Sequence, residues 1–348
     1  VVGIAGHGDD MKRVGKLALR SIVYFEIVTT LALAIGLAAV NIIRPGVGVN
    51  IANGSAALGN DLARTHVTLA GVFEHIVPQS FFEAAANNEV LQIVFFSVLF
   101  GVALARTSKE KKLTMLAFCE SLSEIMFKLT DLVMAFAPFG IGGAIAVTVG
   151  NSGIGVLSHL GMLIITLYIA LIVFIVCVLV PVALLARVPL RKFWRAVKEP
   201  WLIAFSTASS EAALPRAFEC MEQFGVPRRI VAFVLPTGYS FNLDGSTLYL
   251  AVASVFIAQA AGIDMSLRSQ LLMMLTLMLT SKGVAAVPRA SLVILSGALY
   301  QFGLPLEGVA VILGVDAVMD MARTSINLVG NCLATAVMDR WETVRGER

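Results

Sequence analysis

Long apolar runs recur along the chain and predict helices that cross a lipid bilayer. The clearest lie at 21–43, 89–105 and 157–186, and the last of these contains no Asp, Glu, Lys or Arg. A helix rises about 1.5 Å per residue, so about 20 residues cover the roughly 30 Å hydrocarbon core of a membrane. Residues 66–78 are expected to begin the crossing that 89–105 completes, and Pro181 to kink its helix. We therefore expect an all-α integral membrane protein with several spans.

The apolar run at 113–150 differs because it carries charged residues at helical spacing. Glu120, Glu124, Lys128 and Asp131 follow one another at intervals of three or four residues, so they share one helix face. We expect that face to pack on protein rather than on lipid.

Composition and charge fit the same class of protein. Of 348 residues, 58% are hydrophobic and 14% charged, which makes the bilayer the expected solvent. The net charge is only +3 and no Lys/Arg run is long, so no nucleic-acid partner is expected. Basic clusters at 9–20, 106–112 and 187–198 are expected on the cytoplasmic side of an inner membrane. The first residues are already apolar, and we expect an upstream membrane segment to be missing.

Polar residues interrupt the later apolar segments in a way that plain crossings do not explain. The segment 201–215 has Ser, Thr and Glu at its middle and lies between two basic clusters, so a re-entrant helical hairpin is expected. The stretch 240–246 predicts a helix that unwinds at mid-membrane, and 268–300 a second hairpin entered from the opposite side. The segment 306–335 then crosses with a polar stripe. This order indicates the inverted repeats of a secondary transporter.

The polar stripe of the last crossing suggests the substrate. Arg323 can donate two parallel hydrogen bonds to a carboxylate, and Asp320 lies one turn earlier as a partner for an ammonium group. Together they describe an acidic amino acid. The alternative is that Asp320 and Arg323 neutralise each other in a purely structural salt bridge.

Other polar residues are candidates for coupling to a cation. Asn242 and Asp244 offer hard oxygen ligands in the interrupted span, although a capped kink would use the same residues. Glu26 and Glu211 are carboxylates expected to be buried within the membrane, as proton carriers or as structural hydrogen-bond partners. An ammonium at Lys282 would discourage Na⁺ nearby, unless its side chain reaches to the interface.

Four segments resemble the dicarboxylate/amino acid:cation symporter family, and most closely its bacterial proton/glutamate-aspartate branch. They are SSEAALP, PTGYSFNLDGSTLY, TSKGVAAVP and GVDAVMDMARTSINLVGN. The resemblance covers the whole chain and implies an elevator-type homotrimer with two re-entrant hairpins and broken seventh and eighth helices. It places the end of a truncated second helix and a loop at 1–20, and the third and sixth helices at 21–43 and 157–187. A trimerisation scaffold of fourth and fifth helices follows at 64–150, and the transport core at 197–340.

The resemblance also implies roles for individual residues. Arg323 should hold the substrate side-chain carboxylate with Ser246, Asp320 the amino group, and Thr324 and Asn327 the main-chain groups. Ser209 and Ser210 in the first hairpin and Ala286, Val287 and Pro288 in the second should close over the substrate. Residues expected to couple a cation or proton are Gly238, Asn242, Asp244, Asp316, Lys282, Asn331, Glu26 and Glu211.

Departures from the family pattern bear on the coupling ion. Sodium-coupled members typically have Asp where Asn331 stands, Met in place of Leu243 and no Lys at position 282, so we expect proton coupling. Na⁺ near Asn242, Asp244 and Asn327 is the alternative, and no cofactor is expected. Asp320 favours glutamate or aspartate over C4-dicarboxylates, whose carriers usually lack this acid. An anion channel is the rival from a different class, and an enzyme is not expected because the sequence has no nucleophile triad, metal cluster or phosphate loop.

Overall fold

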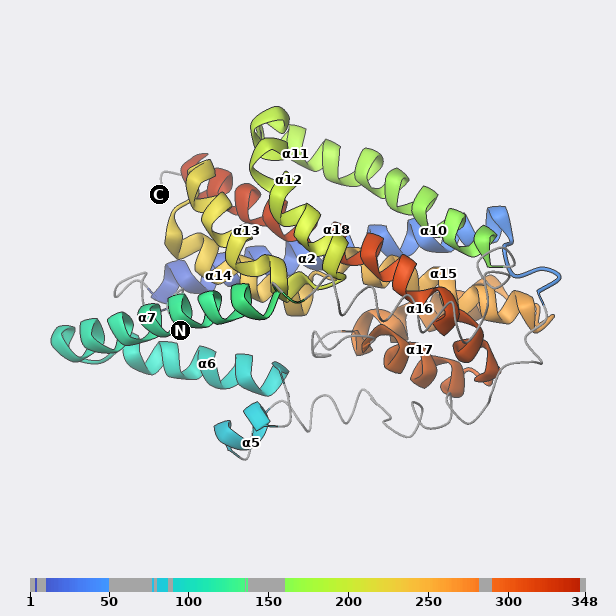
Figure 1. Ribbon diagram of the computed structural model, residues 1–348, viewed down its shortest axis with the longest axis horizontal. Coiled ribbons are helices and arrows are strands. Elements are labelled where there is room, and N and C mark those ends of the chain that lie inside the picture. The colour runs from blue at the N-terminus through green and yellow to red at the C-terminus, as the bar shows by residue number, and fades with distance from the viewer. Residues whose placement is uncertain are drawn as a thin grey trace.

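The computed structural model describes residues 4, 11–49, 77, 80–86, 90–134, 136, 160–281 and 290–344. Within these ranges every regular element is helical, as Figure 1 shows, and the all-α prediction is confirmed for them. Three helical stretches are long and apolar enough to cross a membrane, namely Val14–Ile43, Gly161–Leu185 and Arg228–Ala260. The described part of the chain is therefore that of a helical membrane protein.

The first and third predicted runs form long helices. Helix α2 spans Met11–Ile43 and begins about ten residues before the predicted start. The later run forms α10 (Gly161–Phe174), a π-helical turn at Ile175–Leu179 and α11 (Val180–Leu185). The π turn ends two residues before Pro181. Proline has no N–H to donate, so the backbone hydrogen bonds of the helix must change their pattern just before it.

The segment around 201–215 folds as a helical hairpin, in agreement with the sequence. Helix α12 (Leu190–Thr207) and helix α13 (Ser210–Phe224) pack against each other. The turn between them is short: Ala208 adopts a left-handed conformation (φ 49°) and Ser209 caps α13 by accepting a hydrogen bond from the Ala212 N–H at 3.2 Å. The Thr207 hydroxyl accepts from the Ser209 N–H at 3.2 Å and closes the turn.

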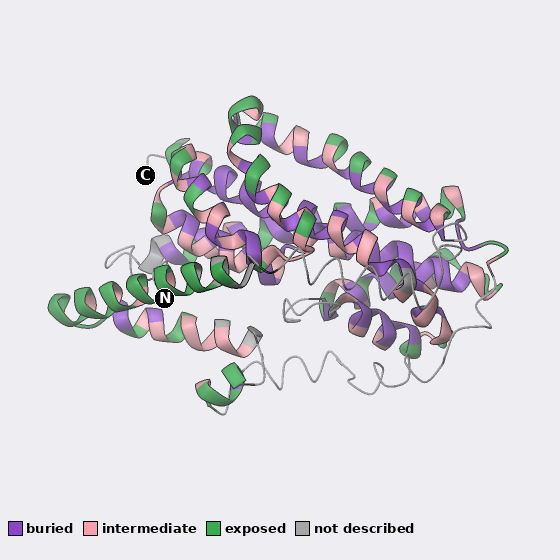
Figure 2. Ribbon diagram, viewed as in Figure 1, coloured by how far each residue is buried: buried purple, intermediate pink, exposed green. Residues whose placement is uncertain are grey.

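The predicted break in the next span is also present. Helix α14 (Arg228–Phe241) ends before Asn242, and helix α15 (Asp244–Ala260) begins after Leu243, so two residues lie outside helical geometry. Helix α15 is the centre of the fold, since α2, α10, α17 and α18 all pack on it. Nearly all of its side chains are buried, as the purple ribbon in Figure 2 shows.

The second hairpin and the last helix follow α15. Helices α16 (Leu267–Thr280) and α17 (Ala290–Gln301) pack together, and the predicted tip between them lies outside the described residues. Helix α18 then runs from Glu307 to Val344 without interruption. The expectation of a broken eighth helix is therefore wrong: no proline occurs in this segment, and its polar side chains bond across to other helices instead of to unwound backbone.

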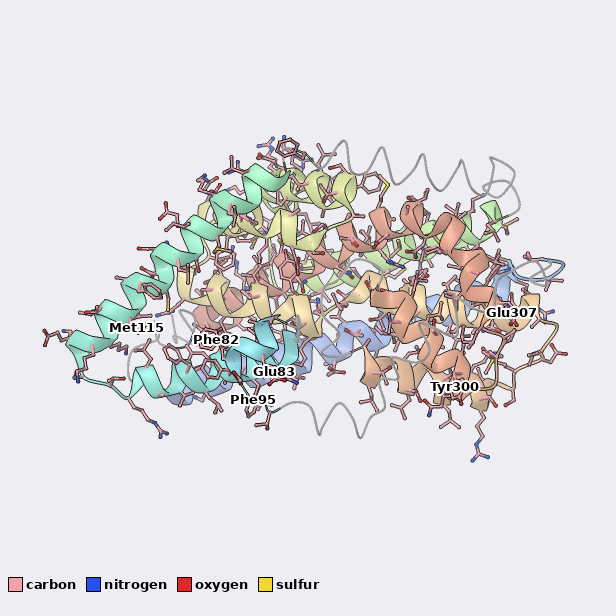
Figure 3. The ribbon with its side chains drawn as sticks, turned by 60° about the horizontal axis from the view of Figure 1, so that its bottom comes forward. Phe82, Glu83, Phe95, Met115, Tyr300 and Glu307 are labelled. Atoms are coloured by element: carbon pink, nitrogen blue, oxygen red, sulfur yellow. The ribbon has the colours of Figure 1, made fainter. Side chains whose placement is uncertain are left out.

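The helices in the middle of the chain lie at the edge of the fold. They are α5 (Phe81–Ala86), α6 (Val90–Ala105) and α7 (Lys109–Met134). Phe82 and Met115 are exposed there (Figure 3). Glu120, Glu124 and Lys128 on α7 are exposed as well, and most of α7 is green in Figure 2. The expectation that this polar face packs on protein is not met within the described part of the chain, because α7 contacts its neighbours only along a narrow strip.

Candidate functional site

Arg323 is the centre of a buried polar cluster on the inner face of α18. Its side chain is only 2% exposed. The guanidinium donates from Nε to Asp320 Oδ1 at 2.9 Å and from Nη1 to Asp316 Oδ1 at 3.0 Å. Its Cζ atom lies 4.1 Å from the centre of the Tyr249 ring on α15, which is close enough for a cation–π interaction. One arginine is thus held by two carboxylates and an aromatic face.

The two carboxylates that hold Arg323 differ in their surroundings. The Asp316 side chain is 3% exposed and also accepts from the Tyr249 hydroxyl at 3.1 Å, whereas the Asp320 side chain is 16% exposed. Asp320 accepts in addition from the Thr324 hydroxyl at 2.8 Å. Asp316 therefore belongs to the arginine cluster by its contacts, although the sequence grouped it with the cation ligands. Asp320 is the carboxylate that an incoming molecule can reach.

Asn327 fastens the start of α15 to α18. Its Oδ1 accepts from the N–H groups of Gly245 and Ser246, at 2.7 and 3.2 Å, and its Nδ2 donates to Ser246 Oγ at 2.9 Å. The first N–H groups of a helix have no partner within the helix, so the amide satisfies two of them. Gly245 is required here because a Cβ atom would collide with the carbonyl of Arg323. The predicted substrate residues Ser246, Asn327 and Arg323 are in this way brought to one place.

A second buried cluster lies at the break between α14 and α15. It meets α18 at Asn331, one helical turn after Asn327. Asn242 Nδ2 donates both to Asp244 Oδ2 at 3.1 Å and to Asn331 Oδ1 at 3.0 Å. Asp244 Oδ1 accepts from the Thr29 hydroxyl of α2 at 3.4 Å. All four side chains are buried. Gly238 lets Asn331 approach, because a Cβ on Gly238 would overlap the amide oxygen.

Two amide atoms in this second cluster have no hydrogen-bond partner among the described residues. They are Asn242 Oδ1 and Asn331 Nδ2, both buried. A buried polar atom that is left unsatisfied costs about 1–3 kcal/mol, so such atoms commonly mark a site where something else binds. Asn242 Oδ1 is an acceptor and can bind a cation, a proton donor or water. Asn331 Nδ2 is a donor and cannot be a ligand to a cation.

The remaining predicted residues are placed less centrally. Ser209 and Ser210 lie at the tip of the α12–α13 hairpin, where Ser209 is the helix cap. Glu211 follows in the first turn of α13, where the residue is exposed although its carboxyl group is partly buried, so the burial expected for it is met only in part. Glu26 is half-buried on α2, where its backbone carbonyl accepts from the Thr30 hydroxyl at 2.6 Å. Lys282, Ala286, Val287 and Pro288 lie outside the described residues.

Sequence reasoning missed two residues of these clusters. Tyr249 supplies both the aromatic face for Arg323 and a donor for Asp316, and it stands inside the motif PTGYSFNLDGSTLY. An aromatic residue five positions after Asp244 in a polar motif is the only signal that could have suggested it. Thr29 reaches Asp244 from a distant segment, and nothing in its own neighbourhood indicates the contact.

Comparison with known proteins gives a consistent result. The model of the sodium:dicarboxylate symporter family matches residues 1–341. Among curated proteins, the proton/sodium-glutamate symport protein of Bacillus subtilis (strain 168) is 46% identical over 347 residues, covering 98% of this chain and 80% of that protein. The proton/glutamate-aspartate symporter of Escherichia coli (strain K12) is 43% identical, covering 98% and 80%. The protein of the same name from Bacillus subtilis (strain 168) is 42% identical, covering 98% and 83%.

The match covers both of the clusters described above, as well as the helical hairpins and the broken span. A family model that extends over nearly the whole chain agrees with relatives at 42–46% identity. The chain belongs to the sodium:dicarboxylate symporter family.

Proposed function

We propose that this protein is a secondary active symporter that imports glutamate or aspartate together with protons across a bacterial inner membrane. The observation that carries the proposal is the buried Arg323, whose two ion pairs hold a guanidinium ready for a carboxylate deep in a helical membrane protein. The similar proteins from Bacillus subtilis and Escherichia coli are named as glutamate or glutamate-aspartate symporters, which supports the same substrate class.

Substrate binding is an exchange of ion partners in this proposal. Arg323 releases Asp320 and donates to the side-chain carboxylate of the substrate, while Asp320 accepts from the substrate's ammonium group. Asp316 and Tyr249 stay in place and keep the guanidinium oriented. The greater exposure of Asp320 supports this division of roles, because only that carboxylate can be approached. Binding an acidic amino acid thus replaces the ion pair between Arg323 and Asp320 by two ion pairs, one from each of these residues to the substrate.

The other substrate contacts surround this exchange. Thr324 is bonded to Asp320 and Asn327 to Ser246, so both pairs adjust when the substrate amine and main-chain carboxylate arrive. The hairpin tip at Ser209 and Ser210 closes over the site from one side. We propose that Ala286, Val287 and Pro288 close it from the other.

Coupling to the proton is proposed to involve the second cluster. Asn242, Asp244 and Asn331 are buried against one another, beside Gly238. One carboxylate among two amides provides less negative charge than a Na⁺ site built from two carboxylates would. Lys282, Asp316, Glu26 and Glu211 are the further residues proposed to take part in cation or proton coupling. Na⁺ bound near Asn242, Asp244 and Asn327 is the alternative, which the names of the Bacillus relatives leave open.

Transport is proposed to follow an elevator mechanism in a homotrimer. Helices α2, α10–α11 and α12–α18 pack into one body around α15, which supports a transport domain made of 21–43, 157–187 and 197–340. Helices α6 and α7 belong to the proposed trimerisation scaffold, 64–150, and the largely exposed surface of α7 suits contacts with other subunits. Two re-entrant hairpins, formed by α12–α13 and by α16–α17, belong to the same proposal.

The test is uptake of radiolabelled aspartate into proteoliposomes, with an inward proton gradient compared with an inward Na⁺ gradient at matched membrane potential. Accumulation driven by the proton gradient alone is expected. Strict dependence on Na⁺ would mean that the coupling cluster has been misassigned, and accumulation with neither gradient would favour the anion channel. Asp320→Ser separates the substrate classes: aspartate uptake should collapse while succinate uptake survives.

A further inference from the structure

An apolar groove runs along the outside of the first hairpin arm, away from both polar clusters. It encloses about 440 Å³ and lies between α10–α11, α12 and the outer side of α18. Tyr168, Ile175 and Val180 line one wall, Trp194 and Trp201 the second, and Val329 the third. Ile175 belongs to the π-helical turn, which widens the helix at this point.

Apart from the indole N–H groups of Trp194 and Trp201, the polar side-chain atoms of the groove lining are bonded within the protein. The Tyr168 hydroxyl donates to the Val318 carbonyl at 3.0 Å, and the Ser325 hydroxyl to the Ala322 carbonyl at 2.8 Å. The groove therefore offers carbon surface to an occupant and no polar group along its floor. A hydrocarbon chain satisfies such a surface, whereas a polar peptide or metabolite does not.

Aromatic side chains form the rim of this groove on α12. The rings of Trp194 and Trp201 lie 5.6 Å apart, and those of Trp201 and Phe205 lie 5.5 Å apart in a stacked arrangement. Trp194 is 48% exposed although it is a large apolar side chain. Tryptophans of this kind are typical of the membrane–water interface, where the ring meets hydrocarbon and the N–H meets polar headgroups.

Basic side chains stand on the same helix face as the tryptophans. Arg191 precedes Trp194 by three residues, and Lys198 lies four residues after Trp194 and three before Trp201, so all four share one side of α12. Both basic side chains are exposed, and within the described residues neither forms an ion pair. The neighbouring Glu199 is bound to Arg216 at 2.8 Å, and the charge of Lys198 acts on it more weakly than Arg216 does.

We propose that this groove binds an anionic phospholipid of the cytoplasmic leaflet. One acyl chain lies between α10–α11 and α12, and the headgroup phosphate lies between Arg191 and Lys198. The apolar wall from Leu190 to Phe205 extends about 22 Å at 1.5 Å per residue, which exceeds the roughly 15 Å depth of one leaflet. The pair of cations complements the charge of the headgroup, as basic residues beside a membrane commonly do.

The position of the groove gives the lipid a mechanical consequence. Helix α12 ends at the hairpin tip, where Ser209 caps the next helix. A chain wedged between α12 and the π-helical turn fixes the distance between this hairpin arm and α10. The proposal goes beyond the proposed transport function, since lipid binding can be measured on a protein that transports nothing.

The experiment uses the intrinsic fluorescence of Trp194 and Trp201. The chain has three tryptophans, and Trp341 packs on Tyr24 elsewhere, so Trp341→Phe leaves the two groove residues as reporters. The protein is reconstituted in phosphatidylcholine vesicles with rising fractions of brominated phosphatidylglycerol or brominated phosphatidylcholine. Each basic residue near an anionic lipid contributes about a fivefold preference. With two basic residues, half-maximal quenching is therefore expected at a roughly 25-fold lower fraction of the anionic lipid.

Variants on the same helix provide the controls. Arg191→Gln with Lys198→Gln should make the two lipids equivalent, and Lys192→Gln should leave the preference intact, because Lys192 lies beside Glu199 and Arg216 in a separate polar pocket. If the double variant does not fold, raising the salt concentration to about 0.5 M with both basic residues unaltered should weaken the preference by screening. Equal quenching by both lipids, an equal loss in Lys192→Gln, or no quenching because protein covers the groove would each overturn the proposal.

Discussion

Removing Arg323 should destabilise the protein mainly because it leaves the Asp316 carboxylate buried without a cationic partner. In Arg323→Met the long apolar side chain fills much of the arginine volume, but Asp316 remains 3% exposed with only the Tyr249 hydroxyl as partner. Breaking a buried ion pair from one side costs about 3–5 kcal/mol. At about 2 °C per kcal/mol for a chain of this size, the apparent Tm should fall by about 6–10 °C.

The double variant Arg323→Met with Asp316→Asn tests this explanation. The neutral amide no longer requires a cation, so at least half of the lost Tm should return, while aspartate binding should stay absent in both variants. Asp320→Asn is the matched control: this carboxylate is 16% exposed and keeps Thr324, so its loss should cost about 1 kcal/mol, or about 2 °C.

The measurement is the apparent Tm of detergent-purified protein, followed by fluorescence on heating, together with aspartate binding. A fall of 2 °C or less in Arg323→Met would contradict the buried-pair argument. The argument would also fail if the double variant melted as early as Arg323→Met, because the stranded charge would then not be the cause.

Three further substitutions test other parts of the structure. Asn331→Asp adds a second carboxylate beside Asp244, so Na⁺ should begin to strengthen aspartate binding in equilibrium titrations; an unchanged affinity with and without Na⁺ would contradict the proposed coupling site. Gly245→Ala places a methyl group against the Arg323 carbonyl, and overpacking should cost about 1–3 kcal/mol, seen as a lower Tm and weaker binding. Ser209→Ala removes the cap of the hairpin tip and should cost about 1 kcal/mol, with Ser209→Asp as the variant that retains stability.

The sequence predicted the elements whose signals are local. A charge-free run specified α10–α11, and a polar interruption specified the break at Asn242 and Leu243. The first hairpin was predicted from basic residues on both sides of a short apolar segment, because charge determines which side of a membrane a loop occupies. The spacing of Asp320 and Arg323 allowed their ion pair as one of two interpretations, since residues three apart are neighbours on a helix.

What the sequence did not predict depends on packing between distant segments. The Thr29–Asp244 contact joins residues 215 positions apart, and Asp316 joins Tyr249 across 67 positions. No periodicity within one helix encodes which residues of another helix will face it. The broken eighth helix was expected from the family resemblance and not from the residues. The helical spacing of the polar stripe agrees with the continuous α18, whose polar side chains find partners on α15.

The shared amide of Asn242 has a consequence for how this family of sequences can vary. Its single NH₂ group serves both position 244 and position 331, so both neighbours must present an acceptor to it. An acid at position 331 still accepts from this amide, whereas an acid at position 242 would remove the shared donor and place a like charge beside Asp244. Position 242 should therefore stay an amide among homologous genes, while position 331 is free to alternate between amide and acid.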